Sequence, residues 1–345
     1  MKNIFLVALV LLFFSCSKTD EEGYTNIPVS IAQPNYFPTK TIDNSNNPLT
    51  EKGVELGKKL FYDGRLSSDG IVSCGFCHIQ EDAFTHHGHT FSHGVNEGIG
   101  TRNTPPLQNL AFMNSYMWDG VTPHLEMQAI IPLTSEIEMN ADLNEVIAMM
   151  SEDTEYKRLY KQAFEDGKIN TENMLKALSQ FMITLVSNNS KYDKIQRGDI
   201  GISYTNLEAE GAHVFEEKCA SCHSGALQSN ESFINNGLPV NPQINDKGRF
   251  VVTNNPLDMY KFRVPSLRNI EKTAPYMHDG RFLTLNAVLN HYASGVQNSA
   301  TLDPFLNQNN TLGIPLNETE KTQLIAFLKT LTDNEFLTDS RFSEF

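Results

Sequence analysis

CGFCH at residues 74–78 and CASCH at residues 219–223 are two copies of one pattern, in which a histidine directly follows the second of two cysteines spaced two residues apart. With this spacing, both thiols can form thioethers with the vinyl groups of a haem while the imidazole binds the iron. The pattern therefore predicts two covalently bound haem c groups with His78 and His223 as proximal iron ligands. The expected attachment residues are Cys74, Cys77, Cys219 and Cys222.

Two other uses of cysteine and histidine fit the pattern less well. Zinc ribbons do not need a histidine directly after each cysteine pair. A thioredoxin-like redox pair is expected in a βαβ setting, which neither copy has. The sequence contains five cysteines, the four of the two motifs plus Cys16, so no pair is left for a disulfide.

A repeat supports a division into two domains, which a length of 345 residues also allows. A Gly-x-x-x-Phe sequence precedes each motif, at 57–61 and at 211–215. After the motifs, eight residues are identical in the two copies at one constant shift, which is the shift from residue 105 to residue 265. Such a register indicates internal duplication. They are Pro105, Leu107, Asn109, Tyr116, Met117, Asp119, Gly120 and Leu125, matched by Pro265, Leu267, Asn269, Tyr276, Met277, Asp279, Gly280 and Leu285.

The fold class predicted from these observations is mainly α, with two tandem cytochrome c-like haem domains related by internal duplication. The expected domains are 49–204 and 205–345. Methionines inside the helical patterns are expected to belong to the core. Apolar residues recur at helical spacing over 51–61, 143–150, 155–164, 172–186, 206–215 and 318–331.

The N-terminus predicts export. Residues 1–15 combine a basic start with a short apolar run before Cys16, which is typical of a bacterial lipoprotein signal with cleavage before Cys16 and lipid on its sulfur. Phe13 and Phe14 are unusual in such a signal, so an ordinary signal peptide is the alternative. Residues 16–48 indicate an acidic tether. The expected location is the periplasmic side of a bacterial membrane, with a lipid anchor.

The formal net charge of -14 restricts the partners. It argues against nucleic acid and allows a basic electron-donor protein to be steered in. Many exported proteins are acidic, so the charge alone selects no partner. No segment after the N-terminal run is a transmembrane candidate.

The two copies differ where an active site would differ. Trp118, the only tryptophan, stands where the second copy has His278. An indole there could help an electron cross between porphyrins or could be core. Glu138 above an open iron could move the proton of a peroxide, although an exposed acidic turn is the simpler alternative. A non-enzymatic dihaem electron-transfer cytochrome, with both irons closed by protein ligands, is the alternative of another class.

The chain resembles the bacterial dihaem cytochrome c peroxidases and the MauG-type dihaem enzymes over about residues 49–335. The resemblance implies an enzyme that reduces hydrogen peroxide to water with electrons from a small redox protein, a cytochrome c or a cupredoxin. The first domain would be peroxidatic and the second would transfer electrons. Besides the haem motifs, it rests on LGKKLF (56–61), RNTP (102–105), WDG (118–120), QAxxP (128–132), Glu138-Met139, GRF (248–250), FRVPSLRN (262–269) and TAPYMHDGR (273–281).

The same resemblance implies roles by position. Trp118 would be the inter-haem tryptophan, Gln128 and Glu138 the distal pair with Glu138 as acid–base residue, and Arg263 a partner of a haem propionate. It also implies a homodimer, which nothing else in the chain supports, and a calcium ion between the haems. The positions that match its oxygen ligands are Asn103, Thr273 and Pro275.

The sequence departs from the typical family pattern at the second haem. Tyr292 stands where typical members place a methionine ligand, fourteen residues after His278. A tyrosine ligand resembles the MauG-type enzymes, so an oxidase that modifies a partner protein is the alternative function. Binding of iron by His291 or another residue, with Tyr292 only packing, is the alternative at this position.

A second departure concerns the loop 85–95, where typical members carry a displaceable distal histidine. Val95 occupies that position here, with His93 two residues away. The first haem is therefore expected to be open without reductive activation. His86, His87 and His89 could bind a metal, but a mobile polar loop is the favoured interpretation.

Overall fold

The computed structural model describes residues 23–24, 27–31, 33–86 and 88–344. The expected signal peptide, Cys16, the first residues of the tether and His87 lie outside these ranges. Within them, no helix combines the length and apolar character needed to cross a membrane.

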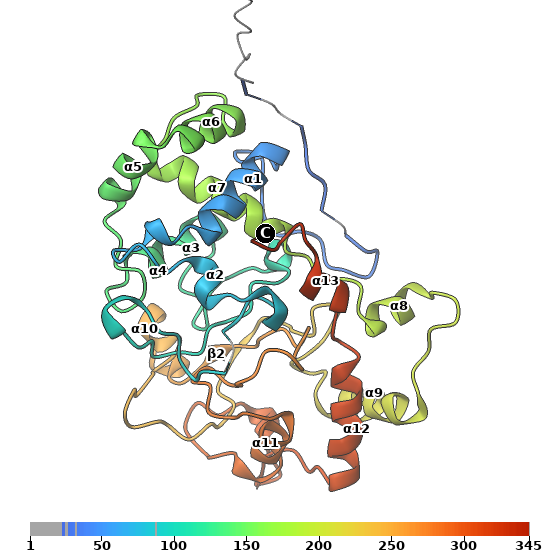
Figure 1. The fold of residues 1–345 in the computed structure, drawn as a ribbon. Coiled ribbons are helices and arrows are strands. Elements are labelled where there is room, and N and C mark those ends of the chain that lie inside the picture. Colours follow the sequence, from blue (N-terminus) through green and yellow to red (C-terminus); the bar gives the residue numbers. More distant parts are fainter. Residues whose placement is uncertain (1–22, 25–26, 32, 87, 345) are drawn as a thin grey trace, which may run out of the picture.

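The described chain is mostly helical and forms two units, one coloured blue to green and the other yellow to red in Figure 1. Every helix expected from apolar spacing is present. The α-helices of the first unit and of the following connection are α1 (Glu51–Tyr62), α2 (Cys74–Cys77), α3 (Leu125–Gln128), α4 (Ile130–Thr134), α5 (Leu143–Glu152), α6 (Thr154–Ala163), α7 (Thr171–Thr184) and α8 (Lys191–Arg197).

The second unit has fewer long helices and a little strand. Its β1 pairs antiparallel with β2, and β3 pairs antiparallel with β4. The bounds are α9 (Asn206–Lys218), β1 (Phe233–Ile234), α10 (Phe250–Thr253), β2 (Phe262–Arg263), α11 (Leu285–Asn290), β3 (Asn307–Gln308), β4 (Thr311–Leu312), α12 (Glu318–Lys329) and α13 (Asn334–Thr338). Short 3-10 turns are η1 (Gly64–Leu66), η2 (Gln80–Asp82), η3 (Val95–Glu97), η4 (Leu110–Phe112), η5 (Pro256–Asp258) and η7 (Pro304–Leu306), and η6 (His291–Gly295) is a π-helical turn.

One helix pair recurs in both units. Helix α1 packs against α7, and α9 packs against α12. In each pair a buried glycine lets two backbones approach closely, because a side chain at Gly57 would overlap the carbonyl oxygen of Ala177, and one at Gly211 would overlap that of Gln323. The Gly-x-x-x-Phe sequence noted before each haem motif is therefore a helix-packing signal.

We expect Gly211→Ala to lower the free energy of unfolding by about 1–3 kcal/mol, because overpacking forces α9 away from α12. Urea denaturation of the holoprotein measures the change. Glu210→Ala, at an exposed neighbouring position on the same helix, is the matched control and should stay within about 0.5 kcal/mol of the wild type. Equal stabilities of the two variants would contradict this account of the glycine.

The contact between the units repeats with the same offset as the sequence identities. The N–H of Asn103 donates to the carbonyl of His278 (2.7 Å), and the N–H of Arg263, the equivalent of Asn103, donates to the carbonyl of Trp118 (2.8 Å). Equivalent segments of the two units thus make the same hydrogen bond to each other, as in a two-fold symmetric interface. Trp118 and His278, where the copies differ in sequence, therefore occupy equivalent places at the contact between the units.

Both ends of the described chain pack against the first unit, although the expected division puts them outside the domain 49–204. Phe336 of α13 packs against Phe84 of the first unit with ring centroids 5.6 Å apart, and Gln80 Nε2 donates to its carbonyl (3.1 Å). Phe37, within the expected tether, is buried against Phe112 (5.2 Å). The C-terminal segment therefore completes the core of the first unit, and the last part of the tether region is packed onto the protein.

Candidate active site

The first haem motif forms a short helix that lies beside a cavity. Ser73 caps α2 by accepting a hydrogen bond from the N–H of Phe76 (3.1 Å). His78 Nδ1 lies 2.6 Å from the carbonyl oxygen of Phe84. Because a carbonyl only accepts, Nδ1 carries the proton and Nε2 keeps its lone pair. Burial lowers the pKa of His78 to about 4, so the imidazole is neutral, as an iron ligand requires.

The cavity next to His78 also contains the two distal residues expected from the resemblance. Gln128, at the end of α3, and Glu138, in the turn between α4 and α5, line it together with His78 and both cysteines of the motif. Gln128 Nε2 lies 3.4 Å from the sulfur of Met117. Burial raises the pKa of Glu138, an effect that a hydrogen bond with Ser135 partly offsets. The exposed-turn alternative therefore describes Glu136, which is exposed, and not Glu138.

The second motif has an equivalent arrangement. His223 Nδ1 lies 3.1 Å from the carbonyl oxygen of Gln228, and burial lowers the pKa of His223. Tyr292, in the π-helical turn after α11, lines the same cavity as His223. His291 is instead held away by a hydrogen bond between its Nε2 and the carbonyl of Asn236 (3.2 Å), and it does not line this cavity. The geometry thus favours Tyr292 over His291 as the second axial residue.

Trp118 and Asn103 line both cavities. The indole Nε1–H of Trp118 donates to the carbonyl of Asn103 (2.7 Å), which fixes the orientation of the ring. Trp118 thus lies between the two sites, as an electron-transfer residue would.

Arg263 has an unsatisfied group beside the second cavity. Its side chain is buried, and Nη1 has no hydrogen-bond partner in the described part of the chain. Burial lowers the pKa of Arg263 to about 10, although Glu231 and Tyr116 oppose this effect. A buried guanidinium normally has an anionic partner. A carboxylate delivered by a group bound in the cavity would supply it.

These observations fit a haem at each motif. The empty space, open parts included, is about 1790 Å³ at the first site and about 1200 Å³ at the second. Each cavity offers an attachment cysteine and a neutral histidine with a free Nε2, and the second adds an arginine that lacks an anion. Cys74, Cys77, Cys219 and Cys222 form no disulfide.

The three oxygen-bearing positions predicted for calcium lie around one cavity. Asn103, Thr273 and Pro275 all line the second site, and the carbonyl of Asn103 already accepts the indole N–H. Within the described ranges, no cluster of three or more His, Cys, Asp or Glu side chains is suited to a metal ion. Calcium binding here stays a prediction that depends on carbonyl and hydroxyl oxygens.

The histidine loop lies at the edge of the first cavity. The rings of His86 and His89 stack at 5.0 Å, and those of His89 and His93 meet edge-on at 4.9 Å. His93 lines the first cavity, whereas Val95 is buried, with its N–H donating to the carbonyl of Glu138 (2.8 Å). The loop therefore supports the position of Glu138 through its backbone.

Sequence reasoning missed some residues of the sites. Asn236 Nδ2 lies 3.5 Å from the hydroxyl of Tyr292, and it has no local motif that could have revealed this contact. Arg102, at the first cavity, pairs with Asp119 and Asp246 at 2.6 Å each. The RNTP sequence drew attention to Arg102, but its partner Asp246 is 144 positions away.

Two haem-attachment turns, two neutral histidines beside cavities and a tryptophan shared by both cavities define a dihaem c-type cytochrome with one cavity equipped for acid–base chemistry. A family model described as di-haem cytochrome c peroxidase matches residues 51–201, and one described as cytochrome c matches residues 208–332. The chain belongs to the dihaem cytochrome c peroxidase and MauG family.

Individual relatives come from both branches of the family. A methylamine utilization protein MauG from Methylophilus methylotrophus is 33% identical over 83% of this chain and 84% of its own length. A cytochrome c551 peroxidase from Nitrosomonas europaea is 31% identical over 86% of this chain and 84% of its own. The crystal structure of a MauG-like protein associated with microbial copper homeostasis superposes with a TM-score of 0.83 at 32% identity, covering 92% of this chain and 99% of that one. The likeness extends over both units.

Proposed function

We propose that this protein is a dihaem c-type peroxidase that reduces hydrogen peroxide to water with electrons from a small redox protein, a cytochrome c or a cupredoxin. The observation that carries the proposal is the placement of Gln128 and Glu138 in the cavity of His78. When bound, the haem iron supplies the coordination position and the electrons for the reaction. An electron carrier with both irons closed would not need this pair.

The side chains of the first cavity handle the protons. The Glu138 carboxylate accepts a proton from one peroxide oxygen and delivers it to the other, so that the O–O bond breaks with water as the leaving group. The amide of Gln128 orients the peroxide by hydrogen bonding. Each turnover consumes two protons and two electrons per peroxide and yields two water molecules. His223 and Tyr292 would hold the haem of the second site, which would receive the electrons, and Trp118, which lines both cavities, would help them cross.

Further parts of the proposal rest on the sequence. Cys16 carries a lipid anchor after signal cleavage and places the enzyme on the periplasmic side of a bacterial membrane. Asn103, Thr273 and Pro275 contribute oxygen ligands to one calcium ion between the haems, since a hard cation prefers oxygen. Arg263 pairs with a propionate of the second haem. The enzyme is a homodimer, as the family resemblance implies.

The test of the function is peroxide-dependent oxidation of a reduced cytochrome c by the exported holoprotein. We expect rapid oxidation with two cytochromes consumed per peroxide. Two six-coordinate haems that ignore peroxide, even when half-reduced, would instead establish the electron carrier.

One observation favours the MauG-like alternative, an oxidase that modifies a partner protein: Tyr292 lines the second cavity. A tyrosine ligand makes a haem easier to oxidise. Mass spectrometry of co-expressed neighbouring proteins would reveal oxygenated or crosslinked side chains. Slow cytochrome oxidation together with a modified partner would favour this alternative.

The pH dependence of kcat/KM for peroxide should report the ionisation of Glu138. A carboxylate that accepts a proton must be ionised, and burial raises the pKa of Glu138 above its usual range. We therefore expect kcat/KM for peroxide to fall as the pH drops through a value above about 4.3, the ordinary pKa of glutamate. Steady-state rates at constant ionic strength measure this limb. A rate that stays constant below the ordinary glutamate range would contradict the assignment.

Matched variants of Tyr292 and His291 test which of the two residues is a ligand of the second haem. We expect Tyr292→Phe to change the ferric absorption and EPR signals of this haem, because the phenol oxygen is lost from its cavity. His291→Phe should change these signals much less, because His291 does not line the cavity and reaches it only through a hydrogen bond with the carbonyl of Asn236. The reverse result would assign the ligand to His291.

A further inference from the structure

The loop 226–228, which follows the second haem motif, is held by hydrogen bonds next to His223. The carbonyl of Gln228 lies 3.1 Å from His223 Nδ1, and the backbone of Pro265 also interacts with this imidazole. The carbonyl of Ala226, two residues earlier, accepts a hydrogen bond from Arg268 Nε (2.8 Å). The carbonyl of Leu227 between them accepts one from the hydroxyl of Ser266 (2.6 Å). Residues 226–228 therefore present three consecutive carbonyls, each with its own fixed donor.

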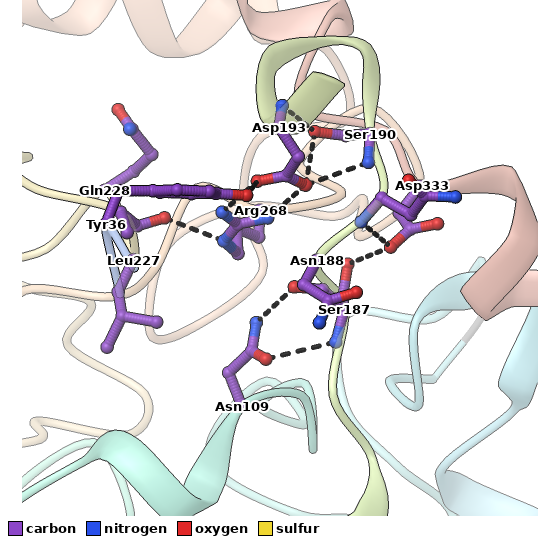
Figure 2. Close-up of polar contacts among 12 residues, drawn as sticks. Tyr36, Asn109, Ser187, Asn188, Ser190, Asp193, Leu227, Gln228, Arg268 and Asp333 are labelled. Carbon is purple, nitrogen blue, oxygen red and sulfur yellow. Dashed lines mark hydrogen bonds and ion pairs between the residues drawn. The ribbon is translucent and has the colours of Figure 1, made fainter. Parts of the chain in front are cut away.

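Arg268 is itself immobilised. Its side chain is 0% exposed, and its two terminal nitrogens bond to the two carboxylate oxygens of Asp193 at 2.9 Å and 2.6 Å. Asp193 also accepts a hydrogen bond from the hydroxyl of Tyr36 (2.8 Å), and the guanidinium lies 4.8 Å from the ring centre of Phe37. Figure 2 shows Tyr36, Asp193 and Arg268 meeting beside Leu227 and Gln228. The arginine thus connects the loop to α8 and to the N-terminal segment.

The first unit has no arginine at the equivalent position. The equivalent of Arg268 at the common offset is Gln108, whose side chain donates to the carbonyl of Arg268 (2.6 Å) and accepts from Asn269. Both bonds lead into the second unit and not to the loop behind His78. Another support of the loop is present in both units, since Thr85 bonds to the carbonyl of Thr104 and Ser229 to that of Val264. Both units therefore share this framework, and the arginine is found beside the second haem motif, with glutamine at the equivalent position of the first unit.

We propose that Arg268, locked by Asp193, is a positioning residue for the second haem: it holds the loop 226–228 so that the Gln228 carbonyl stays bonded to His223. The proposal rests on the proposed role of His223 as an iron ligand. A hydrogen bond to the outer nitrogen of a ligating histidine raises its basicity and tunes the metal. A more basic ligand stabilises ferric iron and lowers the reduction potential. A rigid ligand suits a haem that passes electrons and binds no substrate.

The test is Arg268→Lys in the full-length holoprotein. Lysine keeps the charge but cannot bond bidentately to Asp193 and also reach the carbonyl of Ala226. We expect the midpoint potential of the second haem to rise and its EPR signal to change, while the first haem keeps its potential. Ser266→Ala, which frees only the carbonyl of Leu227, should give a smaller shift in the same direction and serves if the lysine variant does not fold.

Asp333→Asn is the matched control. Asp333 is buried in the polar network of Figure 2 and accepts from Ser187 (3.1 Å) and from the N–H of Asn189 (2.8 Å), but it does not bond to the loop. It should leave both potentials unchanged. The proposal is overturned if the arginine and serine variants also leave the second haem unchanged, or if they shift both haems equally. His223→Ala separates the two hypotheses, because an unaltered second haem in that variant would refute the ligand assignment itself.

Discussion

Glu138→Gln is expected to lower the peroxide turnover of the holoprotein by about 10²–10⁴-fold, the usual contribution of a general acid–base residue. Glutamine has almost the same shape but cannot accept and return a proton. Glu138 lines the cavity of His78, and burial raises its pKa. Haem content should stay at two per chain, because the attachment cysteines are untouched. Stopped-flow oxidation of reduced cytochrome c measures the loss.

A neighbouring glutamate provides the control for this experiment. Glu136 lies two residues earlier in the same turn but is exposed and does not line the cavity. Glu136→Gln changes the net charge equally and should leave turnover close to that of the wild type. If both variants lost activity alike, the effect would come from the charge of the turn. If Glu138→Gln kept full activity, another group would carry the proton.

Local spacing predicts the proximal ligands, and the structure places each of these histidines beside a cavity. The geometry of Cys-x-x-Cys-His is set within five residues, so His78 and His223 could be assigned without knowing the fold. Residues brought together by the fold needed more. Gln128 and Glu138 gained roles from the resemblance, and only the structure places both in the cavity of His78.

Contacts distant in sequence left no recognisable signal. Asn236 approaches Tyr292 across 56 positions, and Tyr36 bonds to Asp193 across 157. The region around Tyr36 has no apolar period, so it indicated a tether, although Phe37 is buried. Composition averages over a segment and does not detect two aromatic residues of which one bonds to Asp193 and the other packs against Arg268.

The ion pair of Asp193 and Arg268 also affects the stability of the folded protein. Both side chains are 0% exposed. Burial alone would raise the pKa of Asp193, but the hydrogen bonds and charge of Arg268, with Ser190 and Tyr36, hold it below its usual range. A carboxylate with a depressed pKa in the folded state stabilises the fold above its unfolded pKa, near 3.9, and this contribution is lost as the pH falls toward the folded value. The pair therefore supports the fold throughout the neutral range.

Asp193→Asn is expected to lower the free energy of unfolding by about 3–5 kcal/mol at neutral pH, because it leaves Arg268 charged and unpaired in the interior. Guanidinium denaturation followed by the haem spectrum measures the loss. Asp199→Asn, which breaks the partly exposed pair with Arg197, is the control and should cost about 0–1 kcal/mol. The double variant Asp193→Leu with Arg268→Met removes both charges and should lose much less than Asp193→Asn. A double variant as unstable as the single one would mean that packing or the other hydrogen bonds of the pair, and not an unpaired charge, cause the loss.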